Sequence, residues 1–88
     1  MLFMVIERFN DAKAVYRRLR EKGRMLPEGL KYVGSWVEAD YNRCFQLMEC
    51  DDASLFQKWV IHLQDLVDFE IVPVIESKQA AKAIEPFL

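Results

Sequence analysis

Few residues of this chain are of a type that performs acid–base or nucleophilic chemistry. His62 is the only histidine, and helical spacing puts it one turn from Trp59 and from Leu66. A histidine at the margin of an apolar helix face is usually half-buried structure, yet it is the side chain that titrates nearest neutral pH. Because no serine stands at a spacing that suggests a partner, His62 alone is the catalytic candidate.

Aromatic residues point to a second kind of chemistry, the binding of a small ligand. Tyr32 and Trp36 flank Gly34 in a strand-like segment, where a glycine indicates the close approach of another group. With Trp59 and His62 on a following helix they would line a pocket with aromatic walls and few polar groups. We therefore predict that Tyr32, Trp36, Trp59 and His62 bind the ligand, with a packed aromatic core as the alternative.

Motifs for phosphate and metal chemistry are missing. The sequence has no glycine-rich phosphate loop, no GxSxG and no HExxH. Glu49, Asp51 and Asp52 lie together, but they precede a helix and have no neighbouring histidine, which indicates helix capping. Neither a metal site nor a cofactor is expected.

The composition describes one small globular domain. The chain has 88 residues, of which 52% are hydrophobic and 30% charged, and it contains no segment able to span a membrane. Its net charge of −2 argues against nucleic-acid binding, although residues 10–24 are locally basic. The first residues read as a strand without the features of a signal peptide, so a cytoplasmic location is expected.

Two cysteines agree with a reducing compartment. Cys44 and Cys50 are six residues apart on one predicted strand, which separates them by about 20 Å. A disulfide spans much less than this distance. We predict that both thiols are unpaired and buried.

The hydrophobic pattern predicts an α+β fold of the ferredoxin-like βαββαβ type, a four-stranded antiparallel sheet with two helices on one face. Residues 1–76 form this domain. Residues 77–88 form a partly helical tail that packs on this chain or on a partner. The predicted strands and helices cover residues 2–8, 11–22, a hairpin over 30–50, about 51–66, and 67–76.

The hairpin is apolar on both faces. If Ala39–Asn42 form its turn, Trp36 lies opposite Phe45, and Gly34 lies opposite Leu47. One face then carries Tyr32, Gly34, Trp36, Phe45 and Leu47, and the other carries Val33, Ser35, Val37, Cys44, Gln46 and Met48. We assign the first face to the helices and to the pocket. The second face needs another cover, which predicts a homodimer.

A family resemblance supports the same architecture. The segments PEGLKYVGSWVEADYNRCFQLMECDD and LVDFEIVPV resemble a bacterial family of short proteins of unknown function in the dimeric α+β barrel superfamily. The resemblance covers the chain to about Ser77 and implies the fold and the homodimer, but no catalytic residue. Haem-degrading members of the superfamily use an Asn, a Trp and a His, whereas here Trp59 and His62 stand closer together than in that pattern.

Three functions remain open at this point. The first is a homodimer that binds a small hydrophobic or aromatic ligand between sheet and helices. The second is a cofactor-independent monooxygenase or an isomerase that uses His62 as its acid–base group. The third is a structural or partner-binding module that uses the basic face of residues 10–24, where Arg17 and Arg18 lie.

Overall fold

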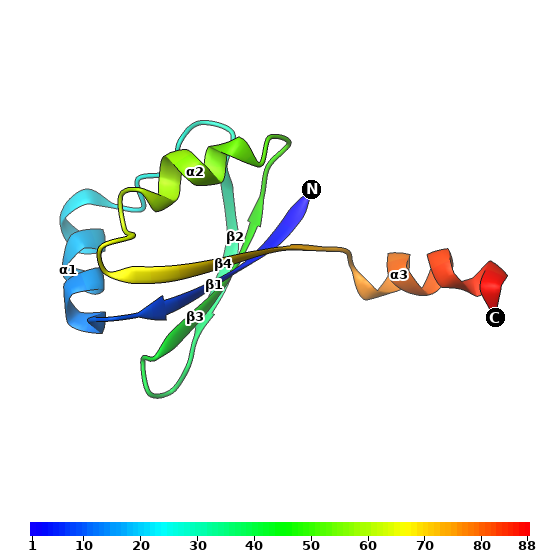
Figure 1. Cartoon of the computed structure of the whole chain (residues 1–88), viewed down its shortest axis with the longest axis horizontal. Helices are drawn as coiled ribbons and strands as arrows, with labels where there is room; N and C mark the ends of the chain where they lie inside the picture. Colours follow the sequence, from blue (N-terminus) through cyan, green and yellow to red (C-terminus); the bar gives the residue numbers. More distant parts are fainter.

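The computed structural model describes residues 1–88 and confirms an α+β fold whose first six elements follow the predicted order (Figure 1). No helix in it has the length and apolarity needed to cross a bilayer. Its elements are β1 (Leu2–Phe9), α1 (Ala12–Lys22), β2 (Lys31–Val37), β3 (Arg43–Glu49), α2 (Ser54–Val60), β4 (Val67–Val74), α3 (Ser77–Ile84) and a final 3₁₀ turn (Glu85–Phe87).

The four strands form one antiparallel sheet in the order β2-β3-β1-β4. This places β4 at an edge, as the sequence predicted from Pro73, whose missing N–H an edge strand tolerates. Helices α1 and α2 both pack against one face of the sheet (Figure 1), and Val15, Phe56 and Trp59 join the core there.

Both helices begin beside aspartates, at positions close to those predicted. Asp11, one residue later than the expected cap Asn10, accepts a hydrogen bond from the backbone N–H of Ala14 at 3.1 Å. Helix α2 is shorter than predicted, because it ends at Val60 and residues 61–66 form turns. His62 therefore lies in a turn and not on the helix.

The hairpin of β2 and β3 has the predicted register. Trp36 pairs with Phe45, Gly34 pairs with Leu47, and the turn is closed by a hydrogen bond from Glu38 N to Arg43 O at 2.9 Å. The register shifts between Tyr32 and Gly34, so that Tyr32 pairs with Met48. This irregularity puts Tyr32 on the face opposite to Trp36, and the prediction that they share a face is wrong.

The assignment of the hairpin faces was also wrong. Cys44, Gln46 and Met48 are buried under the helices, whereas Trp36 is 60% exposed on the other face. Hydrophobicity did not distinguish the faces, because both are apolar. The connection from β1 through α1 to β2 determines which face the helices cover. Because β1 and β2 run parallel, this connection is right-handed, and it places α1 on the face that carries Cys44, Gln46 and Met48.

The C-terminal segment extends away from the domain (Figure 1). Helix α3 contains no buried residue, and the chain has a radius of gyration of 14.9 Å. A compact chain of this length has a radius of gyration of roughly 12 Å. The tail contains a helix and covers none of the core in this chain.

Candidate functional site

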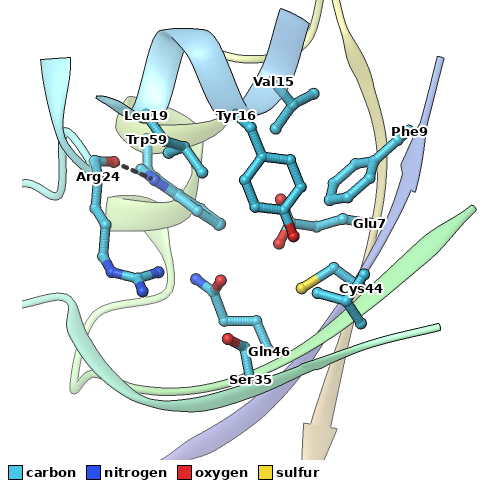
Figure 2. Close-up of a pocket in the computed structure, with 11 residues that line it drawn as sticks. Glu7, Phe9, Val15, Tyr16, Leu19, Arg24, Ser35, Cys44, Gln46 and Trp59 are labelled. Carbon is cyan, nitrogen blue, oxygen red and sulfur yellow. Dashed lines mark hydrogen bonds between the residues drawn. The ribbon is translucent and has the colours of Figure 1, made fainter. Parts of the chain in front are cut away.

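A cavity of about 100 Å³ lies between the sheet and the two helices that cover it (Figure 2). Strands β1, β2 and β3 provide its floor, while α1, α2 and the loop after α1 provide its walls. It is lined by Glu7, Phe9, Val15, Tyr16, Leu19, Arg24, Ser35, Val37, Cys44, Gln46 and Trp59.

The floor of the cavity carries polar side chains on adjacent strands. Glu7 of β1 pairs in register with Cys44 of β3, and Gln46 of β3 pairs with Ser35 of β2. Glu7 and Gln46 are the two buried polar residues of the chain, each 5% exposed. Because Cys44 and Gln46 are two residues apart on one strand, the two polar rows are separated by about 7 Å.

Glu7 holds a proton more tightly than an ordinary glutamate. Burial raises its pKa from 4.5 to about 7, and a hydrogen bond from Cys44 and the positive charge of Arg24 offset part of this rise. Figure 2 shows the hydroxyl of Tyr16 pointing toward the Glu7 carboxyl. Glu7 can therefore gain or lose a proton near neutral pH.

Cys44 is a buried thiol whose surroundings oppose its ionisation. Burial, followed by the nearby charge of Glu7, raises the pKa of its thiol to about 12. Both Cys44 and Cys50 are free and buried, which confirms the prediction that they are unpaired.

Aromatic rings form the walls of the cavity. Phe9 and Tyr16 meet edge to face with ring centroids 6.2 Å apart, and Trp59 meets Phe69 in the same manner at 5.3 Å. Trp59 is only 2% exposed. Its indole Nε1 donates a hydrogen bond to the backbone carbonyl of Arg24 at 3.0 Å, which attaches the loop after α1 to α2 (Figure 2).

The side chain of Arg24 lies at the cavity and is held by Tyr32. Its guanidinium carbon is 3.6 Å from the centroid of the Tyr32 ring, and the Tyr32 hydroxyl lies 2.7 Å from Ser35 Oγ. The two ion pairs of the chain join Arg18 to Asp65 and Arg43 to Glu38. The charge of Arg24 therefore faces the cavity without a carboxylate partner in an ion pair.

The structure brings together two of the four predicted ligand-binding residues. Trp59 lines the cavity, and Tyr32 stands behind it, where it supports Arg24 and Ser35. Trp36 lies on the opposite face of the sheet. His62 is exposed in the turn after α2, where its backbone carbonyl accepts a hydrogen bond from Arg18.

Sequence reasoning missed the polar residues of the cavity, although some had a recognisable signal. At period two, Glu7 shares a strand face with Phe3 and Val5, so a carboxylate stands where an apolar residue is expected. Gln46 is likewise a polar residue on an apolar strand face, between Cys44 and Met48. Arg24 had no such signal, because a loop after a helix has no periodicity.

The structure gives less support to a metal site or to a binding surface on the basic stretch. No group of three or more His, Cys, Asp or Glu side chains is arranged to hold a metal ion. The basic stretch of residues 10–24 is partly used within the chain, since both terminal nitrogens of Arg18 bind the Asp65 carboxylate at 2.6 and 2.8 Å.

The fold and the cavity define a small α+β protein with an aromatic-walled, polar-floored pocket beneath two helices. The chain belongs to the family described as Domain of unknown function (DUF3303), whose model matches residues 1–88. Comparison with curated proteins and with solved structures gave no match. The prediction of a family of unknown function is confirmed, and the superfamily stays a prediction.

Proposed function

We propose that the protein is a homodimer that binds a small, largely aromatic ligand in the cavity between sheet and helices. The observation that carries this proposal is the combination of a polar floor and aromatic walls around open space. The present partners of the buried Glu7 and Gln46 side chains are sulfur atoms: Cys44 Sγ for Glu7 and, at 3.3 Å, Met48 Sδ for Gln46. Because sulfur is a weak hydrogen-bond partner, a ligand with oxygen or nitrogen atoms would satisfy these groups better. The volume of about 100 Å³ is below the usual range for cofactor sites and suits a single ring.

Replacing Gln46 by methionine tests the site, because it keeps the length of the side chain and removes its amide. We expect aromatic and quinone-like compounds to raise the Tm of the wild-type protein in a thermal-shift screen. Loss of one hydrogen bond in Gln46→Met then weakens binding about tenfold. Gln57→Met, the same change on the exposed side of α2, leaves it unaltered. The absence of any stabilising compound at millimolar concentration, or equal losses in both variants, contradicts the proposal.

The open face of the sheet supports the homodimer. Only 13 of the 88 residues are buried, so one chain has a thin core. A second copy packed sheet to sheet would cover this face and complete the proposed ferredoxin-like dimeric α+β barrel. The second copy would also offer a surface to the C-terminal segment, where Ile84 of α3 and the following Phe87 and Leu88 are exposed. The apolar residues on the open face are Leu2, Met4, Ile6, Trp36, Phe45, Leu47, Val72 and Val74.

A charge in the middle of this face should separate the two copies. In Leu47→Arg, dimerisation would bury two unpaired guanidinium groups, so we expect the dissociation constant to rise at least a hundredfold. Size exclusion with light scattering measures this at micromolar protein, with circular dichroism as the check on folding. Ile61→Arg is the control, because Ile61 is 63% exposed in the turn that follows α2. A monomeric wild type, or two variants of equal mass, contradicts the dimer.

Proton transfer is the second candidate function, as in an isomerase or a cofactor-independent monooxygenase. His62 was the acid–base candidate in the sequence, but it lies on the surface away from the cavity. Glu7 lies in the cavity and exchanges its proton near neutral pH, as its raised pKa of about 7 indicates. If a reaction takes place in this cavity, Glu7 is the residue that the geometry favours.

A further inference from the structure

Building on the proposed function, we propose that the cavity takes a single-ring aromatic carboxylic acid, with the carboxylate at Arg24 and a neutral polar substituent at Glu7. The charge at one end of the cavity, the distance between its polar rows and the aromatic walls favour such a ligand.

The charge at one end of the cavity is positive. Arg24 takes part in neither ion pair of the chain, and its guanidinium carbon lies over the Tyr32 ring, 3.6 Å from the centroid. A held guanidinium keeps its planar fork of donors oriented, and this fork matches a carboxylate with two parallel hydrogen bonds. Figure 2 shows the amide of Gln46 in the space beside this guanidinium, where it offers one more donor.

The distance between the two polar rows limits the length of the ligand. Gln46 and Ser35 form one row beside Arg24, and Glu7 and Cys44 form the other, about 7 Å further along the sheet. A six-membered ring with a substituent at each end spans this interval. The cavity volume of about 100 Å³ is small, and Tyr16 and Arg24 at its edge are exposed, so a single ring fits best with its carboxylate at the open end beside Arg24.

The walls select a flat, apolar middle. Trp59 and Tyr16 face the cavity from α2 and α1, and Phe9 adds a ring from β1. Phe9 and Tyr16 already meet edge to face, and Trp59 meets Phe56 in the same manner, so a further aromatic ring can pack between Tyr16 and Trp59 in this geometry.

Glu7 determines the substituent at the far end. The titratable groups that face it are Cys44 from β3, Tyr16 from α1 and Arg24 from the loop, and burial keeps its carboxyl largely protonated up to about pH 7. A protonated carboxyl exchanges hydrogen bonds with a hydroxyl or a carbonyl oxygen. A second carboxylate at this end would be repelled once Glu7 ionises, so dicarboxylates are disfavoured.

The test uses the full chain at pH 7 and four single-ring probes: 4-hydroxybenzoate, benzoate, phenol and benzylamine. Titration calorimetry gives the affinities, and the indole N–H signals of Trp59 and Trp36 in a ¹⁵N spectrum report the location. We expect 4-hydroxybenzoate to bind at least tenfold more tightly than phenol, and benzylamine to bind weakest. The signal of Trp59 should shift on binding while that of Trp36 stays in place.

Variants of Arg24 and Arg20 test whether the tighter binding of 4-hydroxybenzoate depends on the charge of Arg24. In Arg24→Gln the advantage of 4-hydroxybenzoate over phenol disappears, whereas Arg20→Gln, at an exposed position of α1, retains it. If Arg24→Gln does not fold, Arg24→Lys keeps the charge but loses the fork, and the advantage should shrink severalfold.

Four results would overturn the inference: phenol binding as tightly as 4-hydroxybenzoate, benzylamine binding tightest, equal effects of the two glutamine variants, or no binding by any probe. If phenol alone binds and shifts the Trp59 signal, a ligand site exists and only the acid class is wrong. If no probe binds and the wider thermal-shift screen also finds nothing, the proposed function fails as well.

Discussion

Replacing Trp59 by alanine is expected to lower the free energy of unfolding by about 3–5 kcal/mol, the usual cost of removing a large buried aromatic side chain. Trp59 is 2% exposed and meets the rings of Phe56 and Phe69. The change also leaves the carbonyl of Arg24 without its indole donor. Since a small domain has a total stability of about 5–15 kcal/mol, this variant should be close to unfolding at 37 °C.

Trp36 provides the matched control for this loss, since it is 60% exposed. Both alanine variants are best made in the Leu47→Arg background, so that dissociation of a dimer does not enter the measurement. Urea unfolding followed by circular dichroism should then show a change of less than about 1 kcal/mol for Trp36→Ala. Equal losses in the two variants would mean that the core is not where the structure places it.

Replacing Glu7 by glutamine is expected to stabilise the protein at pH 8 by about 3 kcal/mol. The pKa of Glu7 is about 7 in the folded protein against an ordinary value of 4.5, so the folded state binds the proton more tightly. The stabilisation that protonated Glu7 gives the folded state is fully present below pH 4.5 and is lost as the pH rises to about 7. Glutamine stays neutral and removes this loss, which also makes stability nearly independent of pH across that interval.

Urea unfolding at several values between pH 5 and pH 8 measures the effect. Glu38 and Asp65 have the opposite effect on the pH dependence of stability, because hydrogen bonds from Arg43 and Arg18 lower their pKa values. The stabilisation that these two carboxylates provide is lost only in more acidic solution. Glu49→Gln, at an exposed position of β3, should behave as the wild type does. A pH profile of Glu7→Gln that equals the wild-type profile would show that the buried carboxyl has an ordinary pKa. The same variant should abolish any proton transfer in the cavity.

Most of the fold was predictable because it depends on neighbours in the chain. The order of the six elements follows from hydrophobic periodicity, and the pairing of Trp36 with Phe45 follows from the turn between them. The edge position of β4 follows from Pro73. The irregularity at Tyr32 was not predictable, because a one-residue shift in pairing depends on contacts across the sheet.

The candidate site was predictable only in part. Trp59 was expected at a pocket and lines it, whereas the expected companions Trp36 and His62 lie elsewhere. Glu7 could have been recognised as a carboxylate on an apolar strand face. Arg24 could not, because its position depends on the Tyr32 ring and on the indole of Trp59, which is 35 residues away in the sequence.

The sequence by itself determined that these residues form a hairpin with two apolar faces inside a βαββαβ order, since alternation and turn residues act locally. Only the tertiary structure decided which of the two faces lies beneath the helices. The physical reason is that the side on which α1 crosses depends on the right-handed connection between two parallel strands, which hydrophobicity does not encode. That choice puts Glu7, Gln46 and Cys44 in the cavity and leaves Trp36 on the open face.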